Sequence, residues 1–188
     1  MAGKLIVVSG PSGSGKTTIA HRLLEQIPSL RFSVSATTRP MRAGEQNGRD
    51  YYFLSREAFR ERVAEGAFVE WEEVFGNFYG TLVSEVERAR KEGTHLLFDV
   101  DVKGALSIKR RFPEALLIFI APPSREILRE RLRGRHTESE EELRTRLERA
   151  DMEMDMGKEF DCRVTNDELE RAAAEVHQTV YHYLTQSI

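Results

Sequence analysis

Short apolar runs alternate with amphipathic stretches along most of this chain. The apolar runs lie at residues 4–8, 95–100, 115–121 and 161–165. Runs of this length, rich in β-branched residues, are typical of buried strands, and apolar residues recur at helical spacing between them, first over 19–27 and last over 168–184. Strands that alternate with helices predict a parallel sheet covered by helices on both faces. The pattern therefore favours an α/β fold.

Two stretches interrupt this alternation. Residues 33–82 are rich in aromatic and β-branched residues, which predicts a small mixed-sheet subdomain inserted after the first helix. Residues 125–157 are densely charged, and their few apolar residues recur at helical spacing. The length of 188 residues indicates a single domain. Its core is expected to comprise residues 1–32, 83–124 and 158–188.

The composition excludes several classes of protein. A net charge of −3 provides no basic surface for nucleic acid or for an anionic membrane, so neither is expected as a partner. The single cysteine, Cys162, excludes an internal disulfide and is typical of a reducing cytosol. No signal peptide is recognisable, and no apolar run is long enough to span a bilayer. We therefore expect a cytoplasmic protein.

The segment Gly10–Thr17 reads GPSGSGKT and matches the P-loop pattern G-x-x-x-x-G-K-[ST] at every position. It follows the first predicted strand and precedes the first predicted helix, where the backbone N–H groups of such a loop point at phosphate oxygens. Lys16 is expected to reach the β- and γ-phosphates, and the Thr17 hydroxyl to hold Mg²⁺. The residues expected to contact a nucleoside triphosphate are Gly10, Pro11, Ser12, Gly13, Ser14, Gly15, Lys16, Thr17 and Thr18.

A P-loop alone is compatible with an ATPase, a GTPase, a motor or a small-molecule kinase. The guanine-reading N-K-x-D of GTPases has no counterpart at Thr165-Asn166-Asp167, which disfavours that class. The apolar run at 95–100 contains Asp99 near its end, and a carboxylate there is typical of a Walker-B residue that orients Mg²⁺ or its water shell. Thr17 and Asp99 are thus the expected metal-binding residues.

The charged stretch carries eight arginines between positions 125 and 149. Positive charge placed on the transferring group supplies most of the catalysis in phosphoryl transfer. A helical hairpin that folds over the γ-phosphate would exclude water and deliver guanidinium groups, so we expect this stretch to form a lid. Most of these arginines are nevertheless expected on solvated helix faces, paired with glutamates.

A series of further motifs resembles the guanylate kinase family and covers essentially the whole chain. The acceptor-site signature lies in Phe32–Glu45 and Asn47–Phe53. It is continued in order by Phe68–Trp71, Gly76–Thr81, Asp99–Asp101, Ile120–Ser124, Arg131–Arg135 and Val164–Asp167. The resemblance implies a P-loop kinase core whose parallel sheet is flanked by helices, with an inserted mixed-β acceptor-binding subdomain at about 33–82 and a helical lid at about 125–157.

The resemblance also implies roles for polar residues of the acceptor site. Glu70 is expected to accept hydrogen bonds from N1–H and the 2-amino group of guanine, which are two adjacent donors that adenine does not offer. Ser35 and Thr81 are expected to donate toward guanine's acceptor atoms, and Asp101 to lie close to the acceptor nucleoside. The acceptor's phosphate is expected to be held by Arg39, Arg42, Tyr51 and Tyr79. Asp99 is expected to contact the substrate as well as the metal ion.

On the donor side, the resemblance implies that Asn166 and Asp167 lie beside the adenine of ATP and that Arg131 makes a phosphate contact. Arg135 and Arg146 match the lid arginines of the family. The catalytic residues implied by the resemblance are Lys16, Arg42, Arg135 and Arg146.

The implied reaction is direct in-line transfer of a phosphoryl group from ATP to GMP or dGMP with Mg²⁺, for guanine nucleotide synthesis and recycling by a monomer or homodimer. Two other functions stay open. A non-catalytic guanylate-kinase-like module would bind protein in the acceptor cleft, but it has no physical need for the P-loop cation Lys16. A P-loop kinase for another small phosphorylated acceptor would give Glu70 no guanine donors to meet.

Overall fold

The structure, a computed structural model, describes residues 3–134 and 140–186. Its central feature is a five-stranded parallel sheet with the order β2-β7-β1-β8-β9. In chain order these strands are β1 (Leu5–Ser9), β2 (Leu30–Phe32), β7 (His95–Asp99), β8 (Leu116–Ala121) and β9 (Cys162–Thr165). The four predicted strands and the parallel sheet are confirmed, and β2 is an additional edge strand that the sequence analysis did not predict.

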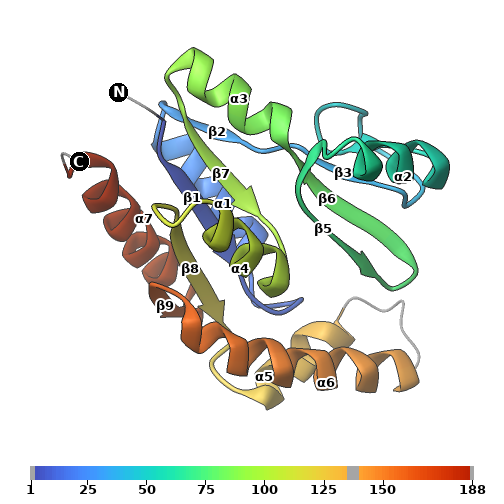
Figure 1. Ribbon diagram of the computed structural model, residues 1–188. Coiled ribbons are helices and arrows are strands. Elements are labelled where there is room, and N and C mark those ends of the chain that lie inside the picture. The colour runs from blue at the N-terminus through green and yellow to red at the C-terminus, as the bar shows by residue number, and fades with distance from the viewer. Residues whose placement is uncertain (1–2, 135–139, 187–188) are drawn as a thin grey trace.

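Helices cover both faces of this sheet (Figure 1). They are α1 (Lys16–Gln26) and α7 (Leu169–Thr185) on one face, and α3 (Val83–Glu92) and α4 (Val102–Arg111) on the other. The alternation of β1 explains the two layers, because Ile6 and Val8 pack with α1 and α7 whereas Leu5 and Val7 pack with α3 and α4. Each face is apolar, as expected for a parallel sheet that is buried on both sides.

A second sheet lies to one side of the first (Figure 1) and has the order β4-β3-β6-β5. Its strands are β3 (Ser35–Thr37), β4 (Tyr52–Phe53), β5 (Phe68–Val74) and β6 (Asn77–Leu82). The pairing is mixed, since β3 runs parallel to β4 and antiparallel to β6. Helix α2 (Arg56–Ala64) packs Phe59 against Phe68 and Phe78 of this sheet. We call residues 33–82 the acceptor-binding subdomain; the sequence analysis predicted its mixed sheet but not its helix.

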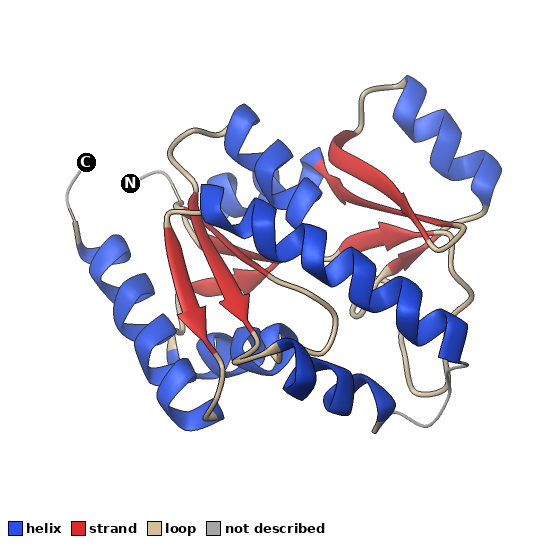
Figure 2. Cartoon of the chain, turned by 90° about the horizontal axis from the view of Figure 1, so that it is seen from below, coloured by secondary structure: helices blue, strands red, loops and turns tan. Residues whose placement is uncertain are grey.

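The charged stretch forms two helices, α5 (Arg125–Arg133) and α6 (Glu140–Met156), followed by the short 3₁₀ turn η1 (Gly157–Glu159). Ser124 caps α5 by accepting a hydrogen bond from the backbone N–H of Ile127. The two helices share a small apolar cluster that includes Leu132 and Leu147. Figure 2 shows the long helix α6 running from the parallel sheet toward the mixed sheet. This pair of helices is called the lid below.

In the part of the chain that the structure describes, no helix is both long and apolar enough to cross a membrane.

Candidate active site

A cleft of about 910 Å³ lies where the parallel sheet, the acceptor-binding subdomain and the lid meet. The P-loop after β1 and Asp99 at the end of β7 lie at the carboxyl ends of the parallel strands, where open α/β sheets bind ligands. The predicted site residues that line the cleft are Gly10, Ser12, Lys16, Thr17, Ser35, Arg39, Arg42, Tyr51, Glu70, Tyr79, Asp99, Asp101 and Arg146. One space thus collects residues from most of the length of the chain.

The P-loop is held in place by a residue from the far end of the chain. Asn166, which is 4% exposed and follows β9, donates from Nδ2 to the carbonyl oxygen of Ser14 at 2.7 Å. Gly15 has φ +91°, and a Cβ on it would lie 2.2 Å from that same Nδ2 atom. Only glycine therefore permits both the left-handed conformation and the close approach of the Asn166 amide. The loop is preorganised by contacts within the protein.

Thr17 and Asp99 lie side by side, because the Thr17 hydroxyl donates to Oδ2 of Asp99 at 2.7 Å. Oxygen ligands of this kind suit Mg²⁺, which usually keeps several waters and takes one or two protein ligands. The two residues therefore fit the metal site that the sequence predicts. Thr18 is exposed on the first turn of α1 beside them.

One end of the cleft is built around Glu70, the residue expected to contact the base. Its Oε1 accepts hydrogen bonds from the backbone N–H of Thr81 at 3.1 Å and from the Thr81 hydroxyl at 2.7 Å. Its Oε2 lies against α4, where a Cβ on Gly104 would be only 2.9 Å away. Burial raises the pKa of Glu70 from 4.5 to about 7 despite these hydrogen bonds, and the nearby Asp101 carboxylate adds to the effect. Thr81 is fully buried and does not face the cleft directly. Its hydroxyl and backbone N–H orient the Glu70 carboxylate.

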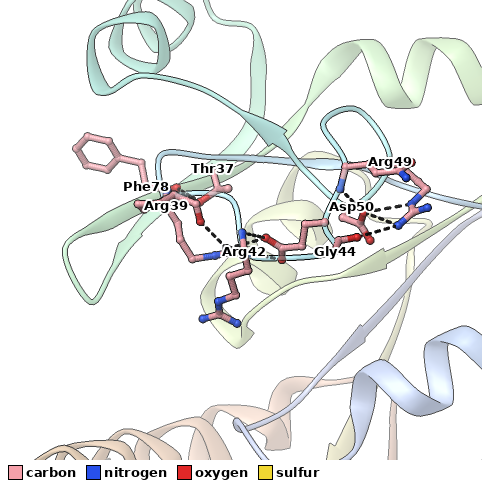
Figure 3. Close-up of polar contacts among 10 residues, drawn as sticks. Thr37, Arg39, Arg42, Gly44, Arg49, Asp50 and Phe78 are labelled. Carbon is pink, nitrogen blue, oxygen red and sulfur yellow. Dashed lines mark hydrogen bonds and ion pairs between the residues drawn. The ribbon is translucent and has the colours of Figure 1, made fainter. Parts of the chain in front are cut away.

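At the end expected to hold the acceptor's phosphate, Arg39 makes a bidentate ion pair with Glu45, with N–O distances of 2.7 and 2.9 Å. Its guanidinium also lies over the ring of Tyr51, which packs edge-on against Tyr79. Burial raises the pKa of Tyr51, so its hydroxyl stays a donor at neutral pH. The Arg42 guanidinium points away from this network (Figure 3) and has no protein partner among the described residues. Arg39, Tyr51 and Tyr79, three of the four residues expected to hold the acceptor's phosphate, are therefore neighbours, and Arg39 is paired with the Glu45 carboxylate.

The lid contributes Arg146, whose Nη1 lies 3.4 Å from the Ser12 hydroxyl oxygen of the P-loop. Arg131 of α5 donates to the Asn166 carbonyl oxygen at 2.9 Å, so it contacts the segment that braces the P-loop. Asp167 forms an ion pair with Arg171 of α7. The predicted catalytic residue Arg135 lies outside the described residues.

Four further residues belong to this site although the sequence analysis did not single them out. Glu45 holds Arg39 from within the acceptor-site signature. Glu72 lines the cleft together with Glu70. Because the two residues are separated by one position in a strand, the sequence already indicated that their side chains share a face. Phe75 and Arg149 line the cleft from the β5–β6 turn and from α6. No local pattern marks Phe75 and Arg149, because their proximity exists only in the folded chain.

Comparison with known proteins agrees with this geometry. The model of the family described as guanylate kinase matches residues 2–183. The chain is 54% identical to the guanylate kinase of Chlorobaculum tepidum over 98% of this chain and 95% of that protein, and 51% identical to that of Chlorobium luteolum over 97% and 93%. The crystal structure of guanylate kinase from Anaplasma phagocytophilum superposes with a TM-score of 0.81 at 33% identity, covering 99% of this chain and 88% of that one. This chain belongs to the guanylate kinase family.

Proposed function

We propose that this chain transfers the γ-phosphoryl group of ATP to the phosphate of GMP, forming ADP and GDP. The observation that carries the proposal is the single cleft that joins a complete P-loop to the buried carboxylate of Glu70. A guanine base and a triphosphate can therefore occupy one cleft. Membership of the guanylate kinase family supports the same reaction.

The P-loop is the proposed binding site for the donor. Backbone N–H groups between Gly10 and Thr17 surround the β- and γ-phosphates at the start of α1, and the Lys16 ammonium adds positive charge. The Thr17 and Asp99 oxygens are the proposed ligands of Mg²⁺, which when bound neutralises charge on the phosphates. The Asn166 amide keeps the loop in its binding conformation, so little ordering remains for the moment of binding.

The acceptor-binding subdomain is the proposed site for GMP. Glu70, oriented by Thr81, accepts from guanine's N1–H and 2-amino group and meets an acceptor atom if adenine enters instead. Arg39, Arg42 and the hydroxyls of Tyr51 and Tyr79 then share the phosphate dianion as donors. Ser35 and Asp101 lie within the same cleft and are the proposed remaining contacts of the nucleoside. We expect dGMP to be accepted as well.

Transfer needs no nucleophile from the protein. An oxygen of the GMP phosphate forms the new P–O bond while the bond from the γ-phosphorus to the bridging oxygen breaks, and ADP leaves with that electron pair. Lys16, Arg42, Arg135 and Arg146 are the proposed catalytic residues, because guanidinium and ammonium groups offset the charge that develops on the transferring group. Arg146 already contacts the P-loop at Ser12, which supports this role.

The setting of the reaction is also a proposal. ATP and GMP pools lie in the cytoplasm, so we place the enzyme there, acting in guanine nucleotide synthesis and recycling. We expect activity from either a monomer or a homodimer.

A coupled assay of ADP release tests the proposal. Purified protein is given ATP and Mg²⁺ with GMP, dGMP, AMP, CMP, UMP or no acceptor. Turnover confined to the guanine monophosphates is the expected result. Turnover with another acceptor would keep the kinase and overturn the base assignment, whereas folded protein that binds GMP without any turnover would indicate an interaction module.

A further inference from the structure

Arg149, on the lid helix α6, contacts side chains from all three parts of the molecule. Its Nη2 lies 3.1 Å from Oδ2 of Asp101 in the core and 3.8 Å from Oε2 of Glu72 in the acceptor-binding subdomain. Its Nε donates to Oε1 of Glu153, one turn along its own helix, at 2.9 Å. The side chain is only 22% exposed. A guanidinium shared by three carboxylates from different elements fixes the relative positions of those elements.

The aromatic ring of Phe75 adds a second contact between the lid and the acceptor-binding subdomain. The guanidinium carbons of Arg149 and Arg146 lie 5.7 and 5.4 Å from the centre of the ring. Stacking of guanidinium groups on an aromatic face at this distance is attractive. The ring is 58% exposed, so it belongs to the cleft surface and not to a hydrophobic core.

The backbone at Phe75 is strained. Phe75 and Gly76 form the two-residue turn between β5 and β6, with φ values of +48° and +76°. Turns with two positive φ values strongly favour Asn, Asp or Gly at their first position. A phenylalanine there is the one non-glycine residue with positive φ in the described part of the chain. Strain of this kind persists where the surrounding contacts compensate for it, and the guanidinium groups of Arg146 and Arg149 contact this ring.

The contacts of Arg149 also explain why the carboxylates of Glu72 and Asp101 can lie close together. Glu72 is 20% exposed and has an Oε2 atom without a hydrogen bond, and burial together with the Asp101 carboxylate raises its pKa to about 7. Lys103 contacts its other oxygen at 3.0 Å. Arg149 is the cation that faces both carboxylates, so its removal leaves them to repel each other beside the base-reading Glu70.

We propose that Arg149 is a positioning residue for phosphoryl transfer, which uses Glu72, Asp101 and Phe75 to hold the lid against the acceptor-binding subdomain. This inference rests on the proposed function. Arg149 acts through Arg146, which lies over the same ring and reaches the P-loop. When Arg149 is lost, α6 is no longer held at the distance from the P-loop that the transfer requires.

Steady-state kinetics of purified full-length variants test the proposal. Arg149→Ala is expected to lower kcat roughly ten- to hundredfold, since a misplacement of about 1 Å has effects of that order. KM for ATP should change by less than twofold, because the hydrogen bond from Asn166 that holds the P-loop is left in place. Arg149→Lys should recover part of the loss, since it keeps the charge without the fork. The matched control is Arg144→Ala on the same helix, an exposed arginine paired with the exposed Glu148, and it should leave kcat unchanged.

Two further variants keep the test informative if Arg149→Ala folds poorly by circular dichroism. Phe75→Asn suits the turn while removing the ring, and should lower kcat severalfold. Glu72→Gln should lower kcat too, and its combination with Arg149→Ala should be no slower than Arg149→Ala alone. A kcat within twofold of wild type for both Arg149→Ala and Phe75→Asn, or losses that multiply in the double variant, would overturn the proposal. If the wild-type protein itself transfers nothing to GMP, it is the proposed function that fails.

Discussion

The Glu70 carboxylate lies in a pocket where its charge is unfavourable until a ligand arrives. Burial raises its pKa to about 7, so at neutral pH a large share of the ligand-free protein carries the protonated form. Guanine would supply two donors that stabilise the charged form. We therefore expect base recognition and ionisation to be coupled at this one residue.

Replacing the carboxylate tests that role at the level of a single residue. Glu70→Gln keeps an oxygen that can accept from Thr81, but its amide presents hydrogens to guanine's own donors. We expect GMP affinity to fall at least about a hundredfold and ATP affinity to stay the same. Isothermal titration calorimetry with each nucleotide measures both. Glu73→Gln is the control, since Glu73 is an exposed neighbour on β5; equal losses for GMP and ATP would argue against base reading.

Arg39, which is expected to contact the acceptor's phosphate, is paired with the carboxylate of Glu45 within the protein. The Arg39 guanidinium and the backbone N–H of Arg42 hold the pKa of Glu45 down at about 2, so Glu45 is a permanent anion. Its carboxylate occupies the Arg39 fork as a phosphate would. The sequence indicated Arg39 through the family resemblance, whereas the ion pair with Glu45 depends on how the loop between β3 and β4 folds back.

At the scale of elements, helix α4 places Gly104 directly behind Glu70. A Cβ there would lie 2.9 Å from Oε2 of Glu70 and 3.2 Å from Oδ1 of Asp101. Asp101 caps the same helix by accepting from the Gly104 N–H at 2.7 Å. The glycine thus allows the helix and the base-reading strand β5 to approach each other closely.

Gly104→Ala separates helix propensity from this packing role. Alanine in a helix is usually favoured over glycine by about 1 kcal/mol, yet here its methyl group displaces the Glu70 carboxylate. We expect KM for GMP to rise at least about tenfold while KM for ATP changes by less than twofold, as measured in the coupled assay. An unchanged KM for GMP would show that the pocket relaxes around the methyl group.

The elements themselves were predictable where their pattern was strong. Strands β1, β7 and β8 are mainly apolar runs and were found, as was the shorter β9. Strand β2 has only three residues, with Arg31 exposed in the middle, so it carries too little pattern to be recognised. Helix α2 buries Phe59 alone, and the aromatic and β-branched residues around it favoured strands. The contacts of Arg149 could not be predicted, because they join elements that are distant in the sequence.

For the whole molecule, the buried carboxylates of the cleft make stability depend on pH. Burial raises the pKa of Glu70 and of Glu72 from 4.5 to about 7, so the folded protein binds more protons than the unfolded chain in that window. Their contribution is therefore present below pH 4.5 and is lost as the pH rises through 7. Glu45, whose pKa is lowered, is fully ionised there and does not oppose them, whereas His95, whose pKa is also lowered, acts in the opposite direction.

Thermal unfolding of wild type and Glu70→Gln at several pH values isolates the Glu70 contribution. The variant cannot titrate at this position, so its Tm advantage over wild type should grow between pH 6 and pH 8. The expected gain is on the order of 1–3 kcal/mol, at roughly 2–4 °C per kcal/mol. Saturating GMP should stabilise wild type more at pH 8 than at pH 6, because it binds the ionised carboxylate. A Tm difference independent of pH would mean that Glu70 titrates normally.

The brace between Asn166 and the P-loop has a consequence for the order in which the protein is made. The phosphate-binding loop is synthesised before the amide that holds it, because Asn166 follows Ser14 by 152 residues. Strand β9, which carries that amide to the edge of the sheet, is also the last strand to be synthesised. A chain that has not yet reached Asn166 contains the P-loop sequence without the amide that holds the loop in its conformation. We therefore expect the loop to reach its binding conformation only after synthesis has passed Asn166 and β9 has joined the sheet.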